Sequence, residues 1–156
     1  MTFRSGDIRV ALRLTAATLI SALLLPAVAH GYTFKPTPAE WAMWPEYCKA
    51  RYSTLQIAKQ QPYTANVPAP MVQTWKTRLG PEAFNAVHHY CAGLAYLQRA
   101  GVAQSEQQRK FLLKSAESEC RYTVERTPVT SPFYREFAGT LQLVQAMRGS
   151  ATSVPR

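Results

Sequence analysis

Apolar residues that recur at spacings of three and four, in segments bounded by proline, are the feature that most constrains this chain. Such spacing places the apolar side chains of a segment on one face of an α-helix. Beyond residue 29 every acidic residue is Glu, which tolerates helix interiors, whereas Asp prefers caps and turns. No run alternates convincingly between apolar and polar residues, as a half-buried strand would. The sequence therefore predicts an all-α domain of about five helices.

Prolines and capping residues set the bounds of the expected helices. Thr37 and Glu40 form a capping box around Pro38, which opens the first helix, and Pro45 should kink or restart it. The apolar stripe of this helix consists of Trp41, Trp44, Cys48, Tyr52 and Leu55. An extended connector is expected over 61–70, followed by helices over 70–79, 81–100, 105–125 and 131–149. Short turns between them indicate stacked antiparallel hairpins.

Residues 1–29 have the features of a secretory signal peptide. Three arginines precede an apolar run of about 15 residues, and small residues then allow cleavage near Ala29 or after Gly31. A membrane span would require about 20 apolar residues, so we expect cleavage and no transmembrane span afterwards. The sequence therefore predicts a periplasmic or secreted protein.

The expected organisation is a cleaved leader over 1–29, one all-α helical-hairpin domain over 30–149 and a frayed tail over 150–156. The formal charge of the whole chain is +9. Cleavage of the leader would remove three Arg and one Asp, so the mature chain stays positively charged. Because an exported chain rarely meets nucleic acid, we expect no nucleic-acid partner. An acidic partner or an anionic envelope surface suits the remaining positive charge better.

Residues 88–145 carry small and aromatic residues in the order of a two-helix repeat: Gly93, Tyr96, Ala116, Pro128 and the pair Ala138-Gly139. In this respect the chain resembles tetratricopeptide and Sel1-like helical-hairpin proteins of the exported bacterial type. It departs from them because Gly93 and Ala116 are 23 residues apart, where a tetratricopeptide repeat has about 12. The resemblance implies a right-handed stack of hairpins whose concave surface binds peptides or partner proteins.

The three cysteines allow one disulfide in an oxidising compartment. We favour Cys48 with Cys91, because both lie in aromatic-rich segments and the bond would join the first helix to the central one. Pairing of Cys91 with Cys120 is the alternative, and it would link the two helices of the repeat-like hairpin. The third alternative leaves all three thiols free and buried.

The segment His88-His89-Tyr90-Cys91 is the sharpest candidate for chemistry. His88 and Cys91 share a helix face, and Cys48 would complete three ligands for a soft or borderline metal, or serve a haem. Adjacent histidines in a helix point about 100° apart, however, and no CxxCH motif is present. We therefore favour a packing role and expect no cofactor, and we keep a metal-binding or haem-binding protein as the alternative.

No motif of a known catalytic class occurs: GxSxG, HExxH, the P-loop and GxGxxG are all absent. The chain is therefore not expected to be an enzyme. The resemblance instead implies an interaction or scaffold module whose partner is another envelope or periplasmic protein. The candidate partner-binding residues all lie in the expected helix over 81–100: His89, Tyr90, Tyr96 and Arg99.

Overall fold

The computed structural model describes residues 32–152 and places side chains through residue 149. Over this range the chain is all-helical and has no strand, which confirms the predicted all-α class. Six α-helices are present there, one more than the approximate count expected. The signal peptide expected over 1–29, its cleavage points near Ala29 and Gly31, and the end of the expected tail lie outside the described residues.

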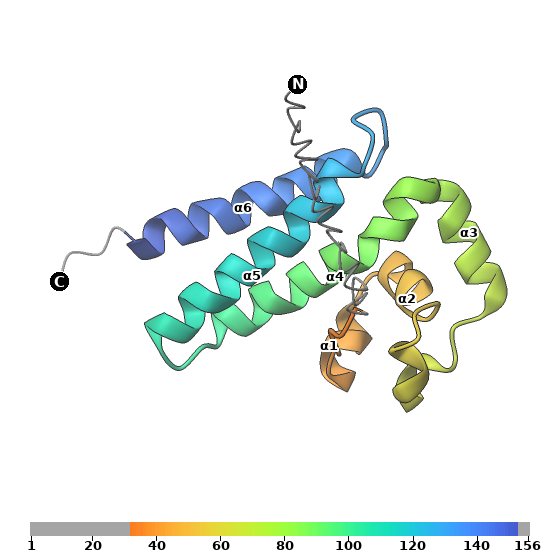
Figure 1. Cartoon of the computed structure of the whole chain (residues 1–156), viewed down its shortest axis with the longest axis horizontal. Coiled ribbons are helices and arrows are strands. Elements are labelled where there is room, and N and C mark those ends of the chain that lie inside the picture. Colours follow the sequence, from red (N-terminus) through yellow and green to blue (C-terminus); the bar gives the residue numbers. More distant parts are fainter. Residues whose placement is uncertain (1–31, 153–156) are drawn as a thin grey trace, which may run out of the picture. The chain divides into compact units, whose positions relative to one another are not determined.

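The elements follow one another along the chain as shown in Figure 1. In order they are α1 (Pro38–Met43), α2 (Glu46–Tyr52), the 3-10 turns η1 (Ala58–Gln60) and η2 (Pro62–Thr64), α3 (Ala69–Leu79), α4 (Pro81–Gly101), α5 (Glu106–Glu125) and α6 (Tyr134–Thr152). The expected extended connector over 61–70 therefore contains one helical turn, η2. Pro62 can begin that turn, and the Thr64 hydroxyl donates to the Ala58 carbonyl at 2.7 Å.

Proline divides the first apolar stripe into two helices, α1 and α2. Trp44 ends α1 with an extended backbone, and Pro45 is extended as well. The ring of a proline disfavours the helical conformation in the residue before it, so the helix restarts at Glu46 rather than bending. The predicted capping box is present, since the Thr37 N–H donates to Glu40 at 2.7 Å and the Glu40 N–H donates to Thr37 at 3.2 Å.

Helix α4 is the central element of the described domain. Most side chains over 83–95 are buried around the whole circumference of the helix, as expected for a helix that is covered on all sides. α5 packs along α4 and α6 packs along α5, while α2 and α3 contact α4 as well. Figure 1 shows α4, α5 and α6 as antiparallel neighbours joined by short loops. No helix within residues 32–152 has the length and apolar character needed to span a membrane.

Helices α4 and α5 approach closely at Gly93. A Cβ atom at this position would lie 2.5 Å from the Cys120 Sγ and 3.3 Å from the Ala116 carbonyl oxygen. Cys120 and Ala116 are fully buried, so neither can move aside into solvent. The small residue in α4 is therefore what lets the two helices pack at this separation.

We expect Gly93→Ala to lower the free energy of unfolding by about 2 kcal/mol, because the added methyl overpacks this contact. Cys120→Ala in the same chain should restore part of the loss, since it removes the sulfur that the methyl meets. Gly139→Ala in α6 is the matched control: nothing lies within 4 Å of its added Cβ, and stability should stay the same or rise. Urea unfolding should be measured for the unmodified protein, Gly93→Ala, the double variant and Gly139→Ala. If Gly93→Ala were as stable as the unmodified protein, the close approach of α4 and α5 would be contradicted.

Candidate functional site

Three of the predicted partner-binding residues, His89, Tyr96 and Arg99, lie along one side of α4, and we call them the α4 face. Residues 32–36, which precede the Thr37 cap of α1, lie against it, and we call these residues the docked segment. The Tyr32 ring packs edge-on against the His89 ring, with 5.0 Å between centroids, and the Phe34 ring packs edge-on against Tyr96 at 5.2 Å. The structure therefore brings the α4 face together with residues that the sequence did not single out.

The docked segment is extended and runs in the same direction as α4. The Tyr32 hydroxyl donates to the His88 carbonyl at 3.0 Å, and the Lys35 carbonyl accepts from the Arg99 guanidinium at 3.4 Å. These contacts place the start of the segment near residue 88 and its later part near residue 99, so the segment follows α4 in the same direction. Exposed and buried residues alternate over 32–36, as expected for an extended backbone.

Side chains of the domain donate to three consecutive carbonyls of the docked segment. The Tyr52 hydroxyl donates to the Phe34 carbonyl at 2.9 Å, and the Tyr63 hydroxyl donates to the Pro36 carbonyl. Arg99 donates to the carbonyl between them, that of Lys35. The donors come from α2, η2 and α4, so three elements together bind the backbone of one extended strand.

The Phe34 side chain fills an aromatic pocket and is only 8% exposed. Its ring stacks on Trp44 with centroids 6.3 Å apart, and the Arg99 guanidinium lies 5.0 Å from its centroid. Aromatic contacts and a cation over the ring face both favour an aromatic side chain here. The pocket therefore selects the side chain, whereas the donors to the carbonyls select only an extended backbone.

Arg99 is held in place by a bidentate ion pair with Glu40. The guanidinium donates to the two carboxylate oxygens at 2.6 and 2.8 Å. Burial opposes ionisation of Glu40, but the hydrogen bonds from Arg99 and Thr37 outweigh it, so the pKa of the carboxyl is lowered. Arg99 is thus fixed beside both the Phe34 ring and the Lys35 carbonyl.

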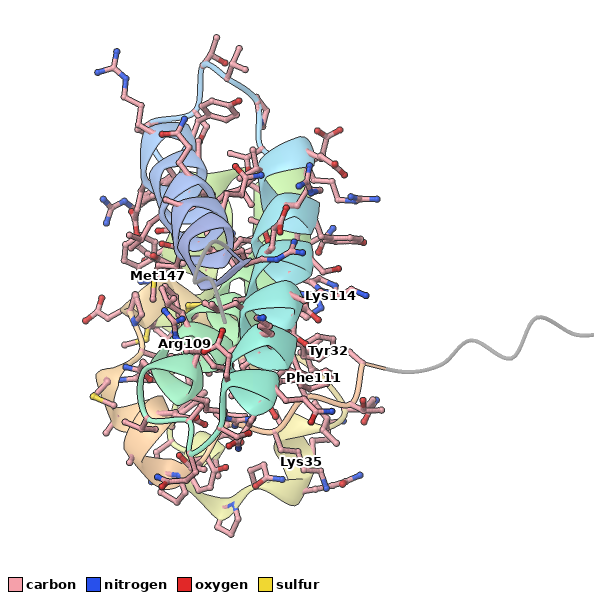
Figure 2. The ribbon with its side chains drawn as sticks, turned by 90° about the vertical axis from the view of Figure 1, so that its left-hand side faces the viewer. Tyr32, Lys35, Arg109, Phe111, Lys114 and Met147 are labelled. Atoms are coloured by element: carbon pink, nitrogen blue, oxygen red, sulfur yellow. A yellow bond between two sulfur atoms is a disulfide. The ribbon has the colours of Figure 1, made fainter. Side chains whose placement is uncertain are left out.

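The end of the α4 face near Tyr32 also contacts α5. The His89 Nδ1 lies 2.6 Å from a Glu119 carboxylate oxygen, and the His89 ring packs on Tyr122 with 4.0 Å between centroids. Tyr122 is 38% exposed, so this end is open to solvent. In Figure 2, Lys35 of the docked segment and the exposed Phe111 and Lys114 of α5 are visible from one side of the molecule.

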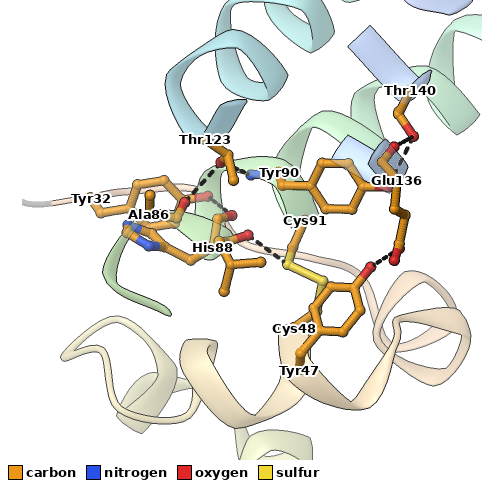
Figure 3. Close-up of a disulfide and its surroundings, with 11 residues drawn as sticks. Tyr32, Tyr47, Cys48, Ala86, His88, Tyr90, Cys91, Thr123, Glu136 and Thr140 are labelled. Carbon is orange, nitrogen blue, oxygen red and sulfur yellow. Dashed lines mark hydrogen bonds between the residues drawn. A yellow bond between two sulfur atoms is a disulfide. The ribbon is translucent and has the colours of Figure 1, made fainter. Parts of the chain in front are cut away.

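Tyr90, the fourth predicted partner-binding residue, is a core residue, so its assignment to a binding surface was wrong. It is 2% exposed, and its hydroxyl lies 2.9 Å from the Thr140 Oγ1 of α6 (Figure 3). Its ring centroid lies 4.5 Å from that of Phe137. Consecutive residues of a helix point about 100° apart, so Tyr90 points away from its neighbour His89. Burial raises the pKa of the Tyr90 hydroxyl to about 12.

The structure contains the favoured disulfide, Cys48–Cys91, which joins α2 to α4 with a Cα–Cα distance of 5.7 Å (Figure 3). Cys120 is a free, buried thiol, and burial raises its pKa to about 12. The alternative metal set of His88, Cys91 and Cys48 loses two thiolates to this bond. No group of three or more His, Cys, Asp or Glu side chains elsewhere in residues 32–149 is placed to hold a metal ion.

His88 is buried and neutral. It is 7% exposed, and the Tyr32 ring covers it edge-on with centroids 4.4 Å apart. Burial, followed by the positive charges of His89 and Arg51, lowers the pKa of the imidazole to about 3. The ring therefore serves as packing between α4 and the docked segment.

Sequence reasoning missed four residues of this site: Tyr32, Phe34, Tyr52 and Tyr63. Tyr32 and Phe34 precede the first helix, where no helical periodicity marks a buried face. Tyr52 lies on the apolar stripe of the first expected helix, and that spacing carries no information about the partner of its hydroxyl. The alternation of Tyr32, Phe34 and Pro36 before the capping box is the one signal that could have indicated a buried extended segment.

Comparison with known proteins does not assign this chain to a family. No family model matches it, and no curated protein or solved structure matches it significantly. The resemblance of residues 88–145 to tetratricopeptide-like hairpins stays a prediction from the sequence.

Proposed function

We propose that this protein is an exported interaction module without catalytic activity, and that its α4 face binds an extended segment of another envelope or periplasmic protein. The observation that carries the proposal is the docked segment itself. The α4 face and its neighbours contact that segment through two aromatic rings and three carbonyls. A surface with this chemistry can accept an extended chain.

Two further observations support export and a scaffold role. Residues 1–29 have the composition of a signal peptide, and a disulfide persists in the oxidising compartments to which such a leader directs a chain. The antiparallel packing of α4, α5 and α6 agrees with a stack of helical hairpins, and we propose that it is a tetratricopeptide-like, right-handed one. The positive charge of the chain would favour an acidic partner or attraction to the anionic envelope.

Site-specific photocrosslinking in cells tests the proposal. We expect a photoreactive phenylalanine at Tyr122, beside the α4 face, to give one discrete crosslinked protein. The matched control carries the same group at Leu143, which is 53% exposed on α6, and should give none. Failure of the Tyr122 position to crosslink any protein, or identical products from both positions, would argue against a binding surface at α4.

A further inference from the structure

We propose that the docked segment is the resident occupant of a peptide site, and that the ligand of this site is an extended segment of a partner protein with the pattern aromatic-x-aromatic-x-Pro. Such a ligand would bind by displacing residues 32–36. The inference rests on the proposed function, because it names the class of ligand that the α4 face accepts.

The burial pattern of the docked segment defines the ligand. Phe34 and Pro36 are buried and Tyr32 is half-buried, whereas Thr33 and Lys35 are exposed. This alternation is that of an extended strand with one face against the protein. Pro36 suits burial because it has no N–H that would require a partner. A competing segment must therefore supply aromatic, aromatic and proline side chains at alternate positions, and the two positions between them are free to vary.

The backbone contacts explain why the site would accept another chain. The donors from Tyr52, Arg99 and Tyr63 reach carbonyl oxygens, which every peptide has. All three donors belong to the folded helices and turns rather than to the docked segment. They are therefore retained as a set when the segment leaves.

The docked segment can leave without opening a helix. Residues 32–36 make no backbone–backbone hydrogen bond to the helices within the described chain, and side chains supply the hydrogen bonds to these residues. Segments held in this way belong to the parts of a protein that open at a free energy below that of global unfolding. An external ligand competes with this closed state, which raises its apparent Kd in proportion to how rarely the site is open.

Weakening the resident occupant should therefore expose the site. The variant Tyr32→Ala/Phe34→Ala, made in the complete chain, removes the two aromatic anchors. The probe is a fluorescent peptide with the sequence of residues 31–37, and its control carries Ala at the position of Phe34. We expect the variant to bind the probe at least about tenfold more tightly than the unmodified protein does, and to bind the control peptide far more weakly.

The matched control protein is Phe111→Ala, which loses an aromatic residue that is 66% exposed on α5. It should bind the probe no better than the unmodified protein. Circular dichroism and an intact disulfide establish that each variant is folded. If the double variant fails to fold, Tyr32→Ala alone provides the test, because this side chain is only half-buried.

Three outcomes would overturn the proposal: no binding of the probe by a folded variant, equal binding of the two peptides, or a stable dimer in which a second copy supplies the segment. The crosslinking at Tyr122 separates this failure from failure of the proposed function. If a partner crosslinks there but the probe does not bind, the interaction module stands and the ligand class is wrong. If the probe binds but no partner crosslinks, the peptide site stands and the proposed partner is wrong.

Discussion

Removal of the Cys48–Cys91 disulfide by the double substitution Cys48→Ala/Cys91→Ala should lower the free energy of unfolding by about 4 kcal/mol. The bond closes a loop of 43 residues, and its loss lets the unfolded chain regain the corresponding entropy. In this structure it also joins α2, which carries Tyr52, to α4, which carries the α4 face. Thermal unfolding should show a midpoint lower by roughly 10 to 20 °C, and urea unfolding gives the free energy.

Cys120→Ala is the matched control, because it removes a buried sulfur but no crosslink. This substitution should lower the free energy of unfolding by about 1 kcal/mol. A reductant should then destabilise Cys120→Ala strongly and leave the double variant unchanged. Non-reducing peptide mapping would contradict this assignment if it linked Cys91 to Cys120. The same map reports the mature N-terminus, which we expect to follow Ala29 or Gly31.

Acidification from pH 7 to pH 4 should remove about 3 kcal/mol of stability through His88 alone. Burial lowers the pKa of this imidazole from its ordinary value of 6.5 to about 3 in the folded protein. As the pH falls below 6.5, the unfolded chain takes up a proton that the folded chain cannot, so stability decreases until the pH approaches 3. Urea unfolding at several pH values measures the slope.

His88→Phe keeps a ring beside Tyr32 but cannot titrate, so it should remove this part of the pH dependence. His89→Gln is the matched control and should keep it. Some acid sensitivity should remain in His88→Phe, because protonation of Glu40, whose pKa is lowered, weakens its pair with Arg99 as the pH falls. An unchanged pH profile in His88→Phe would show that the buried imidazole is not the group responsible.

Local signals predicted the helices well because they act over a few residues. The capping box at Thr37, the Gly80-Pro81 boundary and the Ser105 cap each begin a helix where expected. Pro45 predicted a kink or a restart, and the extended Trp44 backbone produces a restart. The favoured disulfide, Cys48–Cys91, is also present. It was favoured because both cysteines lie in aromatic-rich segments, whereas an apolar helix stripe alone would not have distinguished it from a pairing with Cys120.

The direction in which a side chain points was harder to predict. Tyr90 was predicted to bind a partner together with its neighbour His89, yet Tyr90 packs against Phe137 of α6. α4 is buried around most of its circumference, so its own periodicity does not distinguish the core side from a binding side. The packing of α6 and of the docked segment makes that distinction.

The sequence by itself determined the all-α class and most helix boundaries, because capping, proline and apolar spacing act within one or two turns. It did not predict the turn η2, and α6 begins at Tyr134 rather than at the expected residue 131. Only the tertiary structure decided the site, because its contacts join residues that are distant in the chain. The hydrogen bond from Tyr52 to the Phe34 carbonyl joins residues 18 positions apart in the sequence. The corresponding separation is 27 positions for Tyr63 and Pro36, and 64 positions for Arg99 and Lys35. No local pattern specifies such pairs, since they form only when α2, η2 and α4 have packed together around one extended segment.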